Sequence, residues 1–496
     1  MSKQIKQVVI VGGGTAGWMS ASLLAKLLGK QLNITLIESD QIGTIGVGEA
    51  TIPPIATFNK VLGINEADFI KHTKATFKLG IQFENWGLPG DCYSHAFGDI
   101  GKDLGMTPFH HYYLRAKQAN KNLQLSNFSL NHQAIIAQKF AHIENIANTP
   151  LSGIRHAYHF DAGLYAKYLR QYSENLGVRR IEGKILTTQL NANNGFIDSV
   201  TLENGNKISA DLFIDCSGFK ALLIKDALNI GYQDWSELLP MDRAWAVPSK
   251  STTPIKPYTR SIAHESGWQW QIPLQHRTGN GLVYCSKYMD DDSAKQLLLD
   301  NLDSEAIAEP KLVKFKTGKR EKLWHKNCIA IGLSSGFLEP LESTAIHLIQ
   351  SSIVRLVKLF PNLDFEQTNI DEFNRQGDSE YLQIRDFIIL HYRLNQKQSS
   401  PLWQHSQKMA IPDSLQKKID LFAANGHLFK EQHDLFSEVA WLQVMLGQNL
   451  TPTSYHPVAD QLSDQQLNGF LTDLSNIYKN TCAKMPSHEQ FLQKIT

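Results

Sequence analysis

The chain has 496 residues, of which 42% are hydrophobic and 20% are charged, so it carries enough apolar material for about three domains or one large composite fold. This excludes a peptide-sized module and a wholly disordered chain. Lysine plus arginine (49) exceed aspartate plus glutamate (48) by one, and neither a nucleic acid nor an anionic membrane is therefore expected as a partner held by bulk charge.

The five cysteines are widely spaced and include no C-x-x-C pair. An odd number in this pattern predicts core thiols of a reduced, cytoplasmic protein, and it indicates neither a disulfide framework nor a metal site. The apolar run near the N-terminus is too short for a secretory signal, and no stretch approaches the roughly 20 apolar residues of a membrane span.

The first 40 residues have the pattern of a βαβ unit. Residues 7–11 form a β-branched run, residues 18–28 have helical apolar spacing, and residues 34–37 form a second apolar run. The sequence therefore predicts a strand, a turn, a helix and a second strand, in that order.

The turn between the first strand and the helix matches a dinucleotide-binding fingerprint. Three glycines satisfy G-x-G-x-x-G, and a glutamate ends the second strand about 20 residues further on. The glycines permit a tight turn, close approach of a pyrophosphate and close packing of helix on strand, while the helix N-terminus offers N–H groups to the anion. A plain glycine-rich turn is the alternative. The predicted cofactor-binding residues here are Gly12, Gly14, Thr15, Ala16, Gly17 and Glu38.

Two later segments favour FAD over NAD. Residues 211–218 and 328–332 are apolar strands that end in small residues or glycine, and such strand ends approach an extended dinucleotide. Residues 118–133 are polar and predict a surface excursion, and residues 178–214 predict several short strands around an Asn-Gly turn.

The final third, from Ser343, is mostly helical in pattern and is interrupted by a polar stretch at 396–406. The predicted fold class is α/β, with an FAD-binding, Rossmann-type module, intercalated segments and a mostly helical C-terminal part. We expect residues 1–360 to form the FAD-binding module with substrate-side insertions, and residues 361–496 to form the helical substrate-side region.

Five dispersed segments carry a more specific resemblance. They read G-V-G-E-A-T-I-P at 46–53, G-W-Q-W-Q-I-P at 267–273 and E-P-L-E-S-T at 339–344, together with residues 385–392 and 441–448. These segments resemble those of the flavin-dependent tryptophan halogenase family, whose fold is hydroxylase-like. The W-x-W-x-I-P string distinguishes that family from flavin hydroxylases. By resemblance, the further cofactor-binding residues are Val47, Gly48, Glu49, Ala50, Leu333 and Ile346.

The resemblance implies a reaction. FAD arrives as FADH2 from a separate flavin reductase, and O2 and a halide ion are consumed to make hypohalous acid at the flavin. The acid then travels to an electron-rich aromatic such as an indole. The partners implied are this small aromatic substrate and the reductase, with a homodimer left open.

Lys78 matches the family's catalytic lysine. Its local spacing favours another interpretation, because Lys71, Lys74 and Lys78 lie on one face of a helix and would form a solvated stripe. The resemblance implies instead a partly buried amine, which presents the halogen to the ring either by a hydrogen bond to hypohalous acid or as an N-halo amine.

Glu342 matches the family's catalytic glutamate, which would polarise the hypohalous acid or accept the proton lost from the ring. Its local sequence fits equally well a glutamate at a helix start. Ser343 or Thr344 is a natural N-cap for the helix that follows. By resemblance, the backbone N–H groups of Thr344 and Ala345 hold the halide, and Ser343 contacts the substrate.

Trp268 and Trp270 alternate along a strand and so share one of its faces. Alone, this pattern indicates core packing; by resemblance, the two indoles wall the flavin chamber from the substrate. His95 and Phe97 resemble the pair that sandwiches the substrate ring. Residues 438–443 lack the Tyr-Tyr pair that clamps the amino acid in enzymes acting on free tryptophan, and free tryptophan is therefore not expected as the natural substrate.

Two alternatives remain at this stage. A flavin-dependent aromatic hydroxylase would share the nucleotide fold, but such enzymes commonly have Gly-Asp where this chain has Gly332-Leu333. A non-catalytic flavin-binding protein would have no use for Lys78 together with Glu342.

Overall fold

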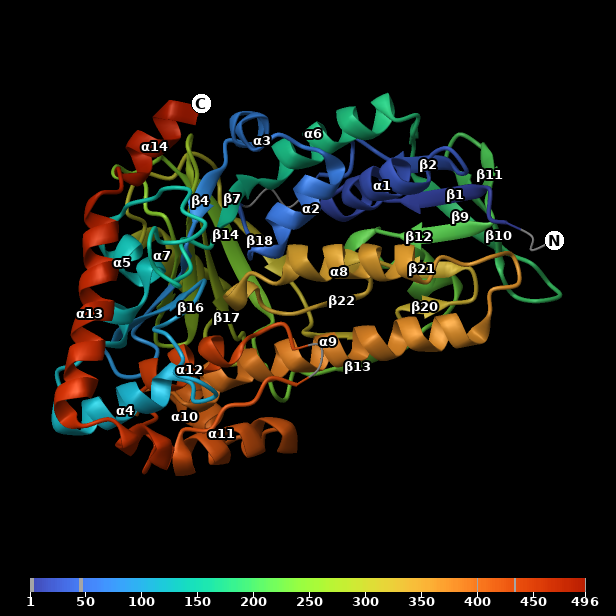
Figure 1. Ribbon diagram of the computed structural model, residues 1–496. Coiled ribbons are helices and arrows are strands. Elements are labelled where there is room, and N and C mark those ends of the chain that lie inside the picture. Colours follow the sequence, from blue (N-terminus) through green and yellow to red (C-terminus); the bar gives the residue numbers. More distant parts are fainter. Residues whose placement is uncertain (1–3, 44–47, 399, 432–433, 496) are drawn as a thin grey trace. The chain divides into compact units, whose positions relative to one another are not determined.

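The computed structural model describes residues 4–43, 48–398, 400–431 and 434–495 (Figure 1). The chain forms two compact units whose segments alternate in sequence. Unit 1 comprises residues 1–75, 160–242 and 314–382, and unit 2 comprises residues 76–159, 243–313 and 383–496. The boundaries of the compact units thus differ from the boundary expected at residue 360. The expected functional division into 1–360 and 361–496 stays a prediction.

Unit 1 is built on a six-stranded sheet. Its order is β20 (Trp324–His325), β21 (Cys328–Ala330), β12 (Leu212–Asp215), β1 (Gln7–Val11), β2 (Asn33–Glu38) and β8 (Arg179–Glu182). All neighbours pair in parallel except the β20–β21 hairpin. Because parallel strands are buried on both faces, they need near-continuous apolar runs, and the β-branched run of β1 is buried along Val8–Val11.

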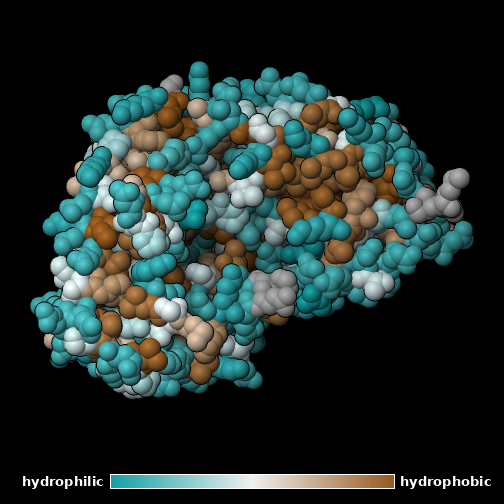
Figure 2. Space-filling model, in the orientation of Figure 1, coloured by the Kyte–Doolittle hydropathy of each residue, from teal (hydrophilic) through white to brown (hydrophobic). Residues whose placement is uncertain are grey.

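Helices of unit 1 pack around this sheet: α1 (Thr15–Leu28), α2 (Pro54–Leu62), α3 (Glu66–Thr73), α6 (Ala162–Asn175), α8 (Ala345–Lys358) and the first part of α9 (Gln367–Arg393). Helix α1 contacts both α6 and α8 (Figure 1). Figure 2 shows hydrophobic side chains gathered over α1 and α8, each of which carries a large exposed apolar residue, Leu27 and Val354 respectively.

Unit 1 also contains two small antiparallel sheets. One contains β9 (Ile185–Leu190), β10 (Ile197–Leu202) and β11 (Lys207–Ser209), and it confirms the short strands predicted for 178–214. The other contains β13 (Tyr232–Asp234), β19 (Gly318–Arg320) and β22 (Gly336–Phe337).

Unit 2 is built on a larger, mainly antiparallel sheet. Its order is β18 (Lys311–Lys314), β14 (Arg243–Ser249), β17 (Thr278–Tyr284), β16 (Gly267–Pro273), β15 (Thr259–Ala263), β5 (Gly80–Glu84) and β6 (Cys92–Ala96). Near it, β4 (Thr76–Lys78) pairs antiparallel with the start of β7 (Ala157–Asp161). The helices are α4 (Phe109–Ala119), α5 (Leu130–Ala137), α7 (Asp291–Asp300), α10 (Pro401–Lys408), α11 (Asp413–Asn425), α12 (Glu438–Gly447), α13 (Asp464–Ala483) and α14 (His488–Ile495).

Several local predictions change. Residues 118–133 are not a surface excursion throughout, because a short 3-10 helix (Leu125–Phe128) and the start of α5 bury Phe128 and Leu130. Helix α10 begins inside the polar stretch 396–406 and buries Trp403. Four of the five cysteines are buried as predicted, whereas Cys92 is exposed, and all five are free thiols. Among the described residues, no helix combines the length and the apolar character needed to cross a membrane.

Candidate functional site

The glycine loop of unit 1 has the geometry of a phosphate cradle. Gly12 follows β1 with a φ of 110°, and its N–H donates to the Ile37 carbonyl at 2.8 Å. A Cβ at Gly12 would lie 2.2 Å from the Cys216 carbonyl oxygen, and one at Gly17 would lie 1.8 Å from the Gly12 carbonyl oxygen. A Cβ at Gly14 would meet no atom within 4 Å. Two glycines thus serve close packing, and the third borders open space at the start of α1, as a bound pyrophosphate requires.

Glu38, at the end of β2, lies beside this loop. A Cβ at Gly13 would lie 1.4 Å from Glu38 Oε2. That oxygen accepts a hydrogen bond from Trp18 Nε1 at 3.3 Å, and Oε1 accepts one from Arg180 Nε at 2.5 Å. The carboxylate is therefore fixed in orientation by neighbours that the sequence pattern did not point to. A ribose hydroxyl would share this acceptor with Arg180.

The two later segments converge on the same loop. Asp215, fully buried at the end of β12, accepts hydrogen bonds from the backbone N–H groups of Ser217, Leu223 and Ile224 at 2.8–3.0 Å and so shapes the turn after the strand. Gly332 has a φ of 79°, and a Cβ there would lie 2.8 Å from the Ala16 Cβ. The segment that carries Leu333 therefore passes directly over the start of α1, which fits the expected FAD path.

The start of α8 provides a second group of backbone N–H donors. Ser343 has a φ of 57°, in the left-handed region that non-glycine residues rarely adopt. Thr344 is the N-cap, although no side-chain capping bond forms, and Ile346 is buried in the first turn. The first N–H groups of a helix have no partner within it, so Thr344 and Ala345 offer donors to an anion. Glu342 precedes them in a short 3-10 helix (Pro340–Glu342) and is 1% exposed.

Strand β3 (Gly48–Ala50) carries the third predicted cofactor segment. Val47 lies outside the described residues. Burial, together with the nearby negative charge of Asp161, raises the pKa of Glu49 to about 7. A carboxyl group with this pKa exchanges its proton near neutral pH.

Lys78 is the last residue of β4 and is completely buried. The predicted helical face of Lys71, Lys74 and Lys78 is wrong, because Lys74 adopts a left-handed φ of 53° and ends α3. The chain then continues as a strand, in which Lys78 lies opposite Ala157 of β7. Lys71 and Lys74 are exposed, and the burial of Lys78 separates it from these surface lysines.

The Phe97 ring connects the end of the Lys78 side chain to an aromatic cluster. The Nζ atom lies 5.4 Å from the centre of the Phe97 ring. The His95 ring lies 5.6 Å from that of Phe387 and 6.1 Å from that of Phe436, and these two phenylalanines are stacked 3.9 Å apart. His95 is buried and does not lie at the surface.

Helix α12 closes this cluster. Trp441 packs edge-on against Phe387 at 4.9 Å. Gln443 Oε1 accepts from the Ala96 N–H at 2.8 Å, and Gln443 Nε2 donates to the Ala96 carbonyl at 3.1 Å. This pair of hydrogen bonds fixes β6, and with it His95, to α12. The sequence analysis gave Phe387 and Phe436 no role, although Phe387 lies in the segment of resemblance 385–392, because their contacts join segments about 290 to 340 residues from His95.

Trp268 and Trp270 lie in β16, between β15 and β17. The whole strand is buried, and the two indoles are 6.1 Å apart. Trp270 lies opposite Gly281, where a Cβ would lie 2.0 Å from the indole. Gly281 therefore makes room for this side chain. The structure brings Lys78, His95, Phe97 and the two tryptophans into unit 2, whereas the glycine loop, Glu342 and the α8 start belong to unit 1.

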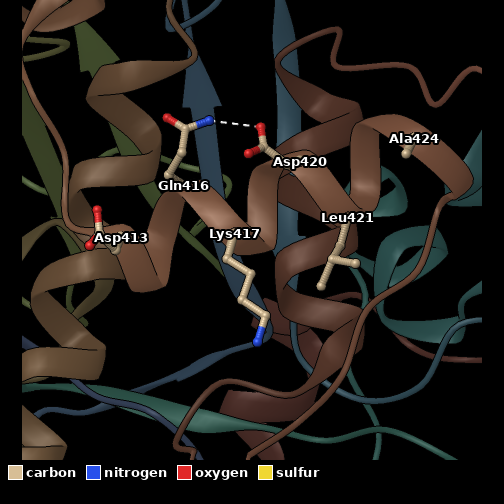
Figure 3. Close-up of a pocket in the computed structure, with 6 residues that line it drawn as sticks. All are labelled: Asp413, Gln416, Lys417, Asp420, Leu421 and Ala424. Carbon is tan, nitrogen blue, oxygen red and sulfur yellow. Dashed lines mark hydrogen bonds between the residues drawn. The ribbon is translucent and has the colours of Figure 1, made fainter.

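A surface pocket of about 430 Å³ lies elsewhere, along one face of α11 (Figure 3). Its lining repeats every three or four residues on that helix, and Gln416 Nε2 donates to Asp420 Oδ1 at 2.7 Å. Since no predicted site residue lines it, we do not assign it to the active site. Its lining residues are Asp413, Gln416, Lys417, Asp420, Leu421 and Ala424.

Comparison with known proteins decides the family. The model of the tryptophan halogenase family matches residues 7–464. The chain belongs to the tryptophan halogenase family. Tryptophan 7-halogenase RebH of Lentzea aerocolonigenes is 32% identical over 100% of this chain and 99% of its own length. Tryptophan 6-halogenase SttH of Streptomyces toxytricini is 34% identical over 89% of each chain.

Solved structures of flavin-dependent halogenases have the same fold. Xcc4156 of Xanthomonas campestris has 46% identity and a TM-score of 0.96, with 99% of each chain covered. BrvH of Brevundimonas sp. BAL3 has 41% identity, also with a TM-score of 0.96 and 99% coverage of each chain. The predicted α/β fold with a Rossmann-type flavin module is confirmed, and this tryptophan halogenase family member is a flavin-dependent halogenase.

Proposed function

We propose that this halogenase acts on a neutral, electron-rich aromatic such as an indole, and that Lys78 delivers the halogen to it. The observation that carries the proposal is the surroundings of Lys78 in unit 2. A completely buried ammonium group lies 5.4 Å from the Phe97 ring, beside the aromatic cluster of His95, Phe387 and Phe436. A ring-lined space beside a buried amine suits an aromatic guest.

The glycine loop, Glu38, Leu333 and the β3 segment would hold FAD in unit 1. The reduced flavin, when bound, supplies hypohalous acid from O2 and halide. The backbone N–H groups of Thr344 and Ala345 hold the halide ion at the α8 start, where the helix dipole favours an anion. Only one dinucleotide fingerprint occurs in the sequence, and we therefore propose that a separate flavin reductase supplies the FADH2.

Each remaining side chain has one task in this reaction. Lys78 holds the hypohalous acid by a hydrogen bond or as an N-halo amine. A bond then forms between a ring carbon and the halogen, the oxygen–halogen or nitrogen–halogen bond breaks, and Glu342 accepts the ring proton as a general base. Trp268 and Trp270 separate the substrate from the flavin, and Ser343 contacts the substrate.

The substrate class follows from the chemistry of the cluster. Its ring contacts come from His95, Phe97, Phe387, Phe436 and Trp441, which recognise a planar ring by stacking and shape. The ammonium group of Lys418 lies 5.2 Å from the centre of the Trp441 ring and already pairs with Asp434 at 3.4 Å. An indole without an amino-acid head group fits these surroundings better than free tryptophan does.

The test is a turnover assay with FAD, a flavin reductase, NADH, and chloride or bromide, against indole, L-tryptophan and simple phenols. Mass spectrometry should show a halogen isotope pattern on indole, with much less product from L-tryptophan. Omission of halide is the control. A gain of 16 daltons would identify a hydroxylase instead, and tight FAD binding without turnover would identify a non-catalytic flavoprotein.

A further inference from the structure

A buried histidine lies next to the strand that carries Lys78. His159 of β7 lies opposite Thr76 of β4 and is completely buried. Both of its ring nitrogens have partners: Nδ1 lies 3.1 Å from Thr76 Oγ1, and Nε2 lies 2.9 Å from Thr259 Oγ1. Since residues two apart on a strand share a face, Thr76 and Lys78 project on the same side of β4, and His159 is bonded on that side.

These contacts fix the tautomer of His159. The single hydroxyl proton of Thr76 is donated to the Pro273 carbonyl at 2.7 Å, so Thr76 Oγ1 can only accept from the imidazole. Nδ1 of His159 therefore carries the proton, and Nε2 accepts from the Thr259 hydroxyl. Burial, and next the positive charge of Lys78, lowers the pKa of His159 well below its usual value. The ring is thus neutral at physiological pH.

A second neutral histidine occupies the other side of the same strand. The Phe77 N–H donates to His488 Nε2 at 3.1 Å, and His488 Nδ1 lies 2.9 Å from the Ile255 carbonyl, to which it must donate. Burial lowers the pKa of His488 to about 4. His488 is the first residue of α14, and Glu489 next to it accepts from the Ile255 N–H at 3.0 Å. The C-terminal helix therefore holds the edge of β4 that does not face β7.

The network reaches two strands of the large sheet. Thr259 is the first residue of β15, and Pro273 is the last residue of β16, the strand of Trp268 and Trp270. Thr76, His159 and Thr259 thus tie the three-residue strand β4 to both. The main chain adds bonds from Leu79 N–H to the Pro257 carbonyl at 2.7 Å and from Phe97 N–H to the Leu79 carbonyl at 2.8 Å.

We propose that His159 and His488 are positioning residues for Lys78, which hold its strand from both sides as neutral imidazoles and so add no second positive charge beside the amine. The proposal rests on the role of Lys78 given under the proposed function. A lysine or arginine could donate the same hydrogen bonds, but its charge would oppose that of Lys78 at short range. Each imidazole instead supplies one donor and one acceptor without a charge.

The expected consequence of losing this support is leakage of the oxidant. Hypohalous acid would still be made in unit 1, but a displaced Lys78 amine would pass less of it to the substrate. Since a misplacement of about 1 Å can cost up to about a hundredfold in rate, the ratio of halogenated indole to O2 consumed should fall by about tenfold. The lost halogen should appear as free hypohalous acid, which the scavenger monochlorodimedone detects.

The sharpest test is a pair of substitutions at Thr259. Thr259→Val removes the hydroxyl that donates to His159 Nε2, whereas Thr259→Ser keeps it. We expect the coupling ratio to fall about tenfold in T259V and to stay within about twofold of wild type in T259S, with the FAD Kd and the rate of flavin oxidation unchanged in both. Equal ratios in the two variants would overturn the role of His159. So would a parallel loss of FAD binding, which indicates general unfolding.

A second pair tests His488. His488→Gln keeps an amide donor and acceptor, whereas His488→Leu keeps neither. The coupling ratio should fall in H488L and recover at least in part in H488Q, and equal ratios would overturn the role of His488. Failure of the proposed function looks different, because then the wild-type protein makes no halogenated product or Lys78→Ala keeps making it. Both proposals fall in that case, whereas failure of the positioning role alone leaves halogenation that depends on Lys78.

Discussion

The glycine loop of unit 1 and the lysine strand of unit 2 were both predicted, but on different grounds. In the loop, the spacing of the residues in the sequence determines their positions in space, because Gly12, Gly14 and Gly17 lie in a single strand–turn–helix connection. In the lysine strand, the local spacing pointed to an exposed helix face, and only the family resemblance pointed to Lys78. The structure buries that residue in a strand.

The difference lies in how far apart the interacting groups are in sequence. Glu38 and Ile37, which contact the glycine loop, lie within about 25 residues of it, although Cys216, Arg180 and Gly332 also approach it from distant segments. The lysine strand is held by Pro273 and by His488, the latter 411 residues from Phe77. A sequence pattern therefore reports the first kind of site well and the second kind poorly.

Lys78→Ala tests the role of the lysine strand and has the largest expected effect. It should lower halogenation of indole by about 10³-fold, because the halogen loses its carrier to the ring, while flavin oxidation continues at the wild-type rate. Product analysis by mass spectrometry and O2 uptake measure the two. Lys71→Ala, at an exposed position of α3, is the matched control and should behave as wild type. Retained halogenation in K78A would remove Lys78 from the reaction.

Glu342→Gln tests the buried glutamate that precedes α8. The amide cannot accept the ring proton, and the halogenation rate should fall by about 10²-fold without a change in FAD affinity. Stopped-flow flavin oxidation and product formation separate the two steps. If FAD binding falls instead, the buried carboxylate of Glu342 has a structural role in unit 1.

Gly14→Ala tests the glycine loop itself. A methyl group at Gly14 meets no protein atom within 4 Å, so the melting temperature of the FAD-free protein should not change. The same methyl group would stand where the pyrophosphate approaches, and the FAD Kd should rise about tenfold, or about 1.4 kcal/mol. Gly469→Ala in α13 also adds a methyl group in open space and should leave FAD affinity unchanged. An unchanged Kd in G14A would show that the cofactor does not use this side of the loop.

The fold followed from sequence wherever a segment is regular over many residues. The predicted run 7–11 is β1, and the helix predicted for 18–28 is α1, which begins three residues earlier at Thr15. The prediction failed where a single backbone angle determines whether a helix continues or ends. The left-handed φ of Lys74 ends α3 and turns an expected helix face into a strand, and lysine has no intrinsic preference for that conformation.

The candidate site divides in the same way. His95 and Phe97 were assigned from one short segment. In the structure Phe97 lies beside Lys78, and His95 packs edge-on against Phe97. Phe387 and Phe436 complete the cluster from α9 and the segment before α12, and no local pattern could associate them. The resemblance covered segments 385–392 and 441–448 but gave Phe387 no role, because stacking partners are defined only once the chain is folded.

Glu49 offers the smallest effect and one that depends on pH. Its pKa is raised from 4.5 to about 7 in the folded protein, so between these values the unfolded chain has released a proton that the folded chain still holds. Stability from this group is therefore present below pH 4.5 and is lost as the pH rises through 7. Since the side chain is partly exposed, the loss should be about 1–2 kcal/mol. In Glu49→Gln this dependence disappears, and the melting temperature of FAD-free E49Q relative to wild type should rise between pH 5 and pH 8. Glu203→Gln, in an exposed turn, should show no such trend, and a constant difference between E49Q and wild type across this range would mean that Glu49 is not held in its protonated form.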